Sequence, residues 1–411
     1  MKRRILFVDD ESLVLQGLQR MLRSLREEWE MEFVSTGLEA LAAMARQRFD
    51  VVVSDMRMPG MSGADLLDRV RELHPATIRL VLSGHADQEL INRCVGTAHQ
   101  YLTKPCEASA LRAVVERVAS TENLLPNQRL MELVAKMDHL PSLPTLYLEL
   151  TRLLREPEVN LDEVGEVMER DLAMTAKILK LVNSAFFGIR RQLSSPAEAA
   201  AYLGAEVLKS LVLSLSVFSE LSHHRVQDFS MESLWNHSLQ VGLAARHLAQ
   251  LQELEGPVAD QCFVAGLLHD AGKLILAANL PESFAAVVAR SQGRGGARAI
   301  ALEREMFGST HAEVAGYLFG LWGLPVPVVE AIALHHTPEA AGPRQFDVIT
   351  AVHVANALVS GPDPAGLEPL LAGVNLDYLK SLGLEGRLPD WQSAVQALLN
   401  RPSPNSPTSN P

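Results

Sequence analysis

The feature that most constrains this chain is the point at which its short apolar runs stop. Before about residue 120, β-rich runs alternate with stretches that carry apolar residues at helical spacing, and after about residue 131 these runs are gone. The runs are Ile5–Val8, Val51–Val53, Leu80–Leu82 and Gln100–Leu102, and the helical stretches are Ser12–Arg26, Ala64–Leu73 and Leu111–Ala119. Strands that alternate with helices need crossover connections, so residues 1–120 predict a doubly wound α/β domain with a parallel sheet covered on both faces.

The remainder predicts a second, all-helical domain over residues 131–400. Signals for helix starts recur there. Asn160-Leu-Asp-Glu163 resembles a capping box, Asp171 can cap a helix over Leu172–Phe187, and Ser195-Pro196 opens another helix.

Two segments are expected to lie outside both domains. Residues 121–130 include polar residues and Pro126, which predicts a linker, although a helix that continues through Leu124 is an alternative. Residues 401–411 are rich in Pro and Ser and predict a disordered tail.

Charge and hydropathy exclude several classes of function. Residues 1–120 carry 16 Lys/Arg and 17 Asp/Glu, whereas the remainder carries 21 and 32. An acidic second half without a basic stripe repels a phosphate backbone, so direct DNA binding is disfavoured. The chain lacks an apolar stretch of the roughly 18 residues that suggest a membrane span, and its first residues do not resemble a signal peptide. The 3 cysteines are far apart and read as reduced thiols, so we expect a cytoplasmic protein.

Acidic residues, a hydroxyl and a lysine follow the ends of the predicted strands. Asp9-Asp10 follows the first run and Asp55 the second, Ser83 ends the third, and Lys104-Pro105 follows the last. Ligands of an open parallel sheet bind outside the carboxyl ends of the strands, so these side chains are expected to converge. Converging carboxylates need a counter-ion such as Mg²⁺. An Asp oxygen beside Mg²⁺ and a lysine is placed to attack a phosphoryl donor.

Over residues 1–120 the chain resembles the receiver domain of two-component response regulators. The segments that carry the resemblance are Ile5-Leu-Phe-Val-Asp-Asp10, Ser54-Asp-Met-Arg-Met-Pro-Gly-Met-Ser-Gly63, Val81-Leu-Ser-Gly-His85 and Tyr101-Leu-Thr-Lys-Pro105. The resemblance implies a five-stranded, flavodoxin-like sheet. It also implies that Asp55 accepts a phosphoryl group from a sensor histidine kinase.

The same resemblance implies a role for each residue around Asp55. Mg²⁺ would be bound by Asp10, Asp55 and the backbone carbonyl of Arg57, with Asp9 acting through water. The phosphate would be contacted by Lys104 and by the Ser83 hydroxyl. Tyr101 would be the switch aromatic, and the Lys104-Pro105 bond would be cis. Dimerisation through the receiver is a further expectation.

Histidines gather in motifs of the helical half. The residues concerned are His237, His269, Asp270, His311, His335 and His336. Any one of these histidines alone is more typical of a hydrogen-bonded core residue. Together, imidazole and carboxylate on inward helix faces are the ligands of a Zn, Fe or Mn site. Lys273 follows Asp270 closely and could bind a phosphate beside such a metal.

Over about residues 131–340 the chain resembles the HDOD branch of the HD superfamily of metal-dependent phosphohydrolases. The segments are Leu140-Pro-Ser-Leu-Pro144, Arg170-Asp-Leu-Ala-Met-Thr175, Leu181-Val-Asn-Ser-Ala185, Tyr202-Leu-Gly204, Trp235-Asn-His-Ser238, Gly266-Leu-Leu-His-Asp270 and Trp322-Gly-Leu-Pro325. The resemblance implies an output that acts mainly by contacting other proteins. Two departures weigh against catalysis: Asn356 stands where HD phosphohydrolases carry a late Asp, and no Gly-Tyr-Pro motif follows His335-His336. His311 and His335-His336 remain available for a two-metal arrangement.

These observations favour a cytoplasmic response regulator in which phosphorylation of Asp55 controls an HDOD domain that binds an unidentified downstream protein. The alternative is a receiver-gated, metal-dependent phosphohydrolase or phosphodiesterase that acts on a nucleotide. The two differ in whether the histidines hold a catalytic metal or only support the core.

Overall fold

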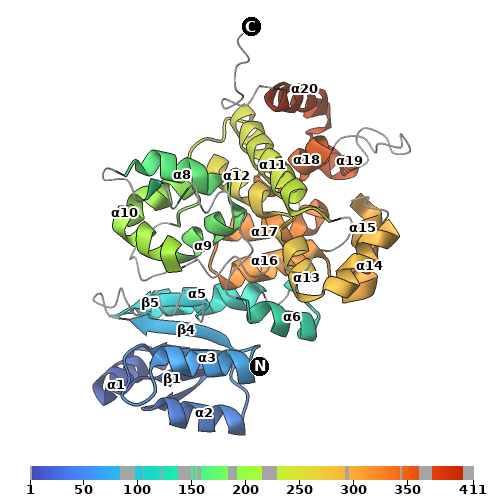
Figure 1. The fold of residues 1–411 in the computed structure, drawn as a ribbon. Helices are drawn as coiled ribbons and strands as arrows, with labels where there is room; N and C mark the ends of the chain where they lie inside the picture. Colours follow the sequence, from blue (N-terminus) through green and yellow to red (C-terminus); the bar gives the residue numbers. More distant parts are fainter. Residues whose placement is uncertain are drawn as a thin grey trace.

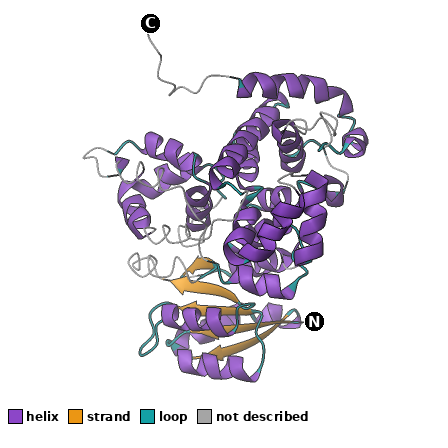
Figure 2. Cartoon of the chain, turned by 45° about the vertical axis from the view of Figure 1, so that its right-hand side comes forward, coloured by secondary structure: helices purple, strands orange, loops and turns teal. Residues whose placement is uncertain are grey.

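The computed structural model describes residues 2–83, 98–104, 106–121, 124–137, 150, 153–154, 159–183, 192–214, 229–291, 296–342, 345–360 and 373–400. A five-stranded parallel sheet at one end of the molecule lies below a larger mass of helices (Figures 1 and 2). The strands are β1 Arg3–Val8, β2 Trp29–Val34, β3 Val51–Asp55, β4 Ile78–Ser83 and β5 Gln100–Thr103, in the spatial order β2-β1-β3-β4-β5. This order is that of the flavodoxin-like doubly wound sheets, and it confirms the predicted fold of the first domain.

Each face of the sheet is covered by helices, as the alternating pattern predicted. The helices are α1 Ser12–Met21, α2 Gly37–Arg46, α3 Gly63–Leu73 and α5 Ala108–Thr121. Side chains alternate along a strand, so Phe7 packs in a cluster with Leu15 and Leu111, whereas Leu6 packs with Ala40 and Leu66.

In this domain the apolar runs missed one of the five strands, and one helix ends earlier than expected. The strand β2 was not among the apolar runs because its sequence, Trp29-Glu-Met-Glu-Phe-Val34, alternates polar and apolar residues at an edge of the sheet. Phe33 of this strand stacks on Phe7 with ring centroids 4.9 Å apart. The helix expected over Ser12–Arg26 ends at Met21, and a 3-10 helix, η1 Arg23–Glu27, follows it.

The second part is helical throughout the residues that the structure describes. Its elements are α6 Gln128–Ala135, α8 Leu161–Glu169, α9 Leu172–Val182, α10 Pro196–Ser214, α11 Met231–Leu251, α12 Pro257–Leu268, α13 Ala271–Asn279, α14 Pro281–Ser291, α15 Gly296–Phe307, α16 His311–Leu321, α17 Val326–Leu334, η5 Pro338–Ala341, α18 Val348–Ser360, α19 Leu376–Ser381, η6 Glu385–Arg387 and α20 Leu388–Leu399. Among the described helices, none combines the length and apolar character that a bilayer crossing demands.

At two of the predicted helix starts, a side chain caps the helix. Asn160 Oδ1 accepts the backbone N–H of Asp162 at 3.1 Å. The side-chain amide of Asn160 donates to Glu163 Oε1, so this contact differs from the predicted capping box, in which that carboxylate accepts a backbone N–H. Asp171 Oδ1 accepts the backbone N–H of Met174 at 3.0 Å at the start of α9. The expected end of this helix at Phe187 lies outside the described residues, as does the tail 401–411.

The two parts of the molecule share one apolar core. A single cluster of buried side chains runs from the β1–β5 face through Val118 and Val134 to Leu318. Both α5 and α6 pack against α16, and they lie between the sheet and the other helices (Figure 1). Because α6 begins at Gln128, part of the segment expected as a linker is helical.

Candidate functional site

The acidic pocket of the first domain forms at the carboxyl ends of the strands, as expected. Asp9 follows β1, Asp55 ends β3, and Lys104 follows β5. The Nζ of Lys104 lies 2.6 Å from Asp9 Oδ2 and also contacts Asp55 Oδ1. Asp9 and Asp55 are buried, whereas Asp10, the next residue of the chain, is exposed.

Backbone geometry fixes the Asp55 carboxylate. Its Oδ2 accepts the backbone N–H of Arg57 at 2.7 Å. A Cβ on Gly63 would lie 2.0 Å from the Asp55 carbonyl oxygen, so only glycine allows α3 to begin this close to β3. Burial alone lowers the pKa of Lys104, but its hydrogen bonds with Asp55 and Asp9 outweigh that effect, and its pKa is raised. The lysine therefore stays charged and offsets the two carboxylates.

Three further residues predicted for this pocket are only partly described. Ser83 ends β4 and Tyr101 lies in β5, where it pairs with Val81, but the side chains of Ser83 and Tyr101 lie outside the described residues. Pro105 also lies outside them, so its peptide bond is not described.

The histidines predicted in the second domain converge on Asp270. His237 lies on α11, and His269-Asp270 links α12 to α13. His311 begins α16, and His335-His336 follows α17. Two groups have ligand atoms within 4.8 Å of one another, namely His237, His269 and Asp270, and His311, His335 and His336.

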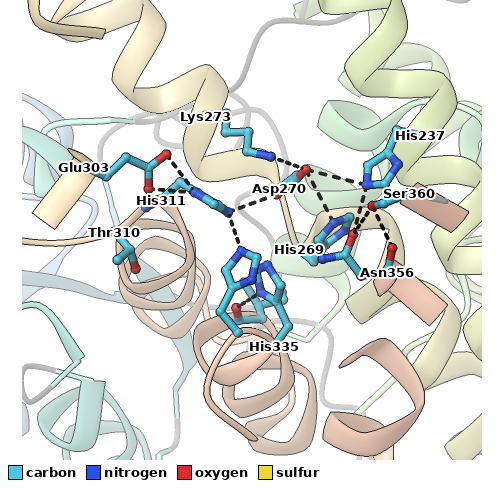
Figure 3. Close-up of polar contacts among 12 residues, drawn as sticks. His237, His269, Asp270, Lys273, Glu303, Thr310, His311, His335, Asn356 and Ser360 are labelled. Carbon is cyan, nitrogen blue, oxygen red and sulfur yellow. Dashed lines mark hydrogen bonds and ion pairs between the residues drawn. The ribbon is translucent and has the colours of Figure 1, made fainter. Parts of the chain in front are cut away.

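Asp270 connects the two groups (Figure 3). One carboxylate oxygen, Oδ1, lies 3.0 Å from His311 Nε2, and the other, Oδ2, lies 3.4 Å from His269 Nε2. Lys273 Nζ donates to Oδ2 at 2.6 Å. Asn356 also reaches this cluster, because its Oδ1 lies 3.1 Å from His237 Nε2.

The donor set fits a first-row divalent metal such as Zn²⁺, Fe²⁺ or Mn²⁺. His269 and His335 each use Nδ1 to contact a backbone carbonyl, that of Gly266 and of Ile332, both at 2.7 Å. The Nε2 atoms of both rings are buried and find no hydrogen-bond partner among the described residues. A buried polar atom without a partner costs free energy, and a bound cation would satisfy both atoms.

Burial keeps several of these rings neutral, which is the form that binds a metal. Burial lowers the pKa of His269 to about 4, and burial with neighbouring imidazoles holds the pKa of His335 and of His336 well below the usual range. His311 differs. Burial lowers its pKa, but Glu303 outweighs this, so that the pKa is raised.

Two buried residues beside the cluster were not predicted from the sequence. The carboxylate of Glu303 lies 2.8 Å from His311 Nδ1. His353 Nδ1 lies 2.8 Å from the carbonyl oxygen of His335, and its Nε2 accepts the backbone N–H of Asn375 at 2.9 Å. His353 lies three residues before Asn356, which the sequence did single out, whereas no motif pointed to Glu303.

Comparisons with known proteins identify both domains. The family model of the response regulator receiver domain matches residues 5–116, and that of the HDOD domain matches residues 140–338. An uncharacterized protein of Treponema pallidum is 29% identical over 54% of this chain and 43% of its own length. The hydrogenase transcriptional regulatory protein HoxA of Cupriavidus necator is 32% identical over 40% of this chain and 36% of its own length. The chain thus spans less than half the length of either relative.

Among solved structures, the MmoQ response regulator of Methylococcus capsulatus is 25% identical, with a TM-score of 0.49, and the match covers 64% of this chain and 99% of that one. The receiver fold, its acidic pocket and the family matches define a response regulator with a separate output domain. The chain belongs to the response regulators that join a receiver domain to an HDOD domain.

Proposed function

We propose that Asp55 is the phosphoryl acceptor of this response regulator and that a sensor histidine kinase supplies the phosphoryl group. The observation that carries the proposal is the contact of Lys104 with both Asp9 and Asp55 at the carboxyl ends of the strands. A lysine at this position can neutralise charge that develops on the transferring group. Asp55 Oδ2 accepts the Arg57 backbone N–H at 2.7 Å, which restrains the orientation of the carboxylate.

Mg²⁺ is the cofactor that the acidic pocket fits. Asp10, Asp55 and the carbonyl oxygen of Arg57 would hold the ion, and Asp9 would act through water. Oxygen ligands with retained waters are what Mg²⁺ prefers. When bound, the ion supplies positive charge to the phosphoryl donor. Ser83 and Tyr101 keep their proposed roles as phosphate contact and switch aromatic.

The test is phosphorylation of the full chain by a small phosphodonor such as acetyl phosphate with Mg²⁺. The wild-type chain is expected to gain one phosphoryl group, seen as a mass shift, and Asp55→Asn is expected to gain none. Phosphorylation of Asp55→Asn to the wild-type level would assign the acceptor elsewhere. Asp50→Asn is a matched control, because Asp50 is an aspartate next to β3 whose carboxylate accepts the Arg4 backbone N–H outside the pocket.

We propose that phosphorylation of the receiver reaches the HDOD domain through α16. Gln100 Nε2 of β5 donates to the Leu321 carbonyl at the end of this helix at 3.2 Å. A Cβ on Gly320 would lie 2.1 Å from Thr121 Cγ2 of α5, so the two helices are in close contact. Asn127 Nδ2 donates to the Phe307 carbonyl, before the start of α16, at 2.6 Å. Movement of β5 and α5 would therefore reach α16, and the HDOD surface would engage or release a downstream protein.

A second candidate function is a metal centre in the HDOD domain, favoured by the buried Nε2 atoms of His269 and His335, which make no hydrogen bond among the described residues. His237, His269 and Asp270 would hold one ion, and His311, His335 and His336 a second, with Asp270 between them. A bound ion of this kind would supply Lewis acidity toward a phosphate ester. Lys273 would hold a phosphate beside it. Metal content of the full chain, purified without oxygen or added metal, tests this candidate. Retention in wild type and loss in His335→Ala is the expected result, and metal-free wild-type protein would reject it.

A further inference from the structure

Glu303 is a buried carboxylate whose polar partners in the described part of the chain belong to His311. It is 2% exposed. Its Oε2 accepts the backbone N–H of His311 at 2.8 Å. The Nδ1 atom of the same residue lies 2.8 Å from Oε2 and 2.9 Å from Oε1. Figure 3 shows Glu303 on one side of the His311 ring and Asp270 on the other.

This arrangement determines which ring nitrogen of His311 is available. A carboxylate oxygen only accepts hydrogen bonds, so the nitrogen that faces Glu303 carries a proton. A neutral imidazole with a proton on Nδ1 presents its lone pair at Nε2. That atom lies 3.0 Å from Asp270 Oδ1 and 3.3 Å from His336 Nε2. By the same rule Nε2, which faces the Asp270 carboxylate, is protonated in the metal-free protein, so a bound ion would displace that proton while Glu303 keeps the proton on Nδ1. Glu303 therefore sets both the tautomer and the rotation of the ring toward the cluster.

We propose that Glu303 is the positioning residue of the metal centre. It holds His311 with the Nε2 lone pair directed at a divalent first-row ion, and its charge offsets part of the charge of that ion. A carboxylate that accepts the second ring N–H raises the basicity of a ligating imidazole. The inference rests on the metal centre proposed above and adds a residue that is not itself in either ligand group.

A purely structural role for Glu303 makes a different prediction. The carboxylate also accepts the first backbone N–H of α16, and negative charge stabilises a helix N-terminus. The chain offers a matched control at the same helix end. Glu313 Oε2 accepts the Thr310 backbone N–H at 2.9 Å, and its Oε1 contacts Arg304 at 2.9 Å. Glu313 thus serves the helix terminus through contacts other than those that orient the His311 ring.

The experiment compares Glu303→Gln with Glu313→Gln in the full chain. Co²⁺ is titrated into metal-free protein and followed by its visible absorption, with excess Mg²⁺ present to occupy the acidic pocket of the receiver. Glu303→Gln is expected to weaken Co²⁺ binding by about 10- to 100-fold, the usual effect of losing such a partner, whereas Glu313→Gln binds as wild type does. The metal-free variants are expected to unfold at similar temperatures.

Each of three results would overturn the inference, and each would do so for a different reason. Wild-type affinity in Glu303→Gln would remove Glu303 from the metal centre while leaving that centre intact. Equal weakening by both variants would assign the effect to the helix terminus. Failure of the wild-type chain to bind Co²⁺ would reject the metal centre itself, together with the role of Glu303.

Discussion

In both sites a buried carboxylate is held by opposite charge from a partly exposed lysine. Lys104 bridges Asp9 and Asp55 in the receiver. In the HDOD domain, Asp270 is contacted by Lys273 and by imidazole rings. The pKa of its carboxyl lies well below the usual range, because the contacts with His269, Lys273 and His311 outweigh the effect of burial. A buried charge without a partner destabilises the folded state, so removing one partner is expected to lower the stability of the protein.

The first prediction at this scale concerns Lys104→Met. Asp9 and Asp55 would then face each other without the ammonium, which should destabilise the metal-free chain by about 1–3 kcal/mol, less than for a fully buried pair because Lys104 is partly exposed. Mg²⁺ supplies the missing charge, so it should stabilise this variant more than the wild type. Chemical unfolding with and without Mg²⁺ measures both effects. An equal response of the two proteins to Mg²⁺ would contradict the proposed ion site.

The second prediction at this scale concerns the stability of the protein at low pH. The folded-state pKa of His269 is about 4, below the ordinary value of 6.5, because burial disfavours the charged ring. The unfolded chain therefore binds the proton more readily, so stability is full above pH 6.5 and falls as the pH drops toward 4. The loss from this one ring amounts to about 3 kcal/mol over the whole window.

Thermal unfolding of metal-free protein at several pH values within that window measures the loss. His269→Gln has no titrating ring at this position, so its unfolding temperature should depend less steeply on pH than that of the wild type. Identical slopes for the two proteins would show that another group controls the acid response.

At the scale of elements, glycines set how closely the helices that carry the clustered histidines can approach. A Cβ on Gly272 of α13 would lie 1.9 Å from the carbonyl oxygen of His311, the first residue of α16. A Cβ on Gly266 of α12 would lie 2.8 Å from the Cα of Gly242 on α11. The histidines converge because the backbones of their helices touch.

Gly272→Ala is therefore expected to push α13 and α16 apart. The overlap involves backbone, which cannot rotate away, so we expect a loss of stability of about 1–3 kcal/mol and weaker metal binding through displacement of His311. Gly17→Ala on α1 is the matched control. A Cβ there meets nothing within 4 Å, and the change should stabilise its helix by about 0.5–1 kcal/mol. Unfolding midpoints and Co²⁺ affinity of both variants check this, and wild-type values in Gly272→Ala would contradict the close-packing explanation.

The sequence predicted elements well where one physical signal dominates. Apolar runs marked β1, β3 and β4, because these three strands lie in the middle of the sheet and are buried by the layers around them. The edge strand β5 was marked by the shorter run Gln100–Leu102. The alternating β2 gave a weaker signal, since an edge strand buries less of each residue. The histidines that converge on Asp270 were singled out by their motifs. Glu303 was not, because its sequence neighbours Arg304 and Glu305 are exposed, and only the fold buries the carboxylate against His311.

At the scale of the whole molecule, α16 belongs to both halves of the proposed switch. One end of it carries His311 of the cluster, and the other end touches Gln100 and Thr121 of the receiver. If the two sites bias the same helix, each must alter the binding free energy of the other by an equal amount.

We therefore expect Co²⁺ affinity to differ between the phosphorylated and unphosphorylated chain, by about 5-fold or more if the coupling is of ordinary size. Gln100→Ala, which removes the hydrogen bond to Leu321, should reduce that difference. The same titration as above measures it in each form of the protein. Equal affinities in the phosphorylated and unphosphorylated wild type would rule out α16 as a link between the sites.

The shared core also affects how the chain is made. Gln100 and its partner Leu321 are 221 residues apart, and Asn127 and Phe307 are 180 apart. Ribosomes add about 5–20 residues each second, so the completed receiver waits roughly 10–40 seconds for α16 to be synthesised. During that interval the apolar side chains of α5 and α6 that later meet α16 are exposed on the nascent chain, where chaperones can bind them. Slow codons placed between the two halves should therefore lower the yield of folded protein.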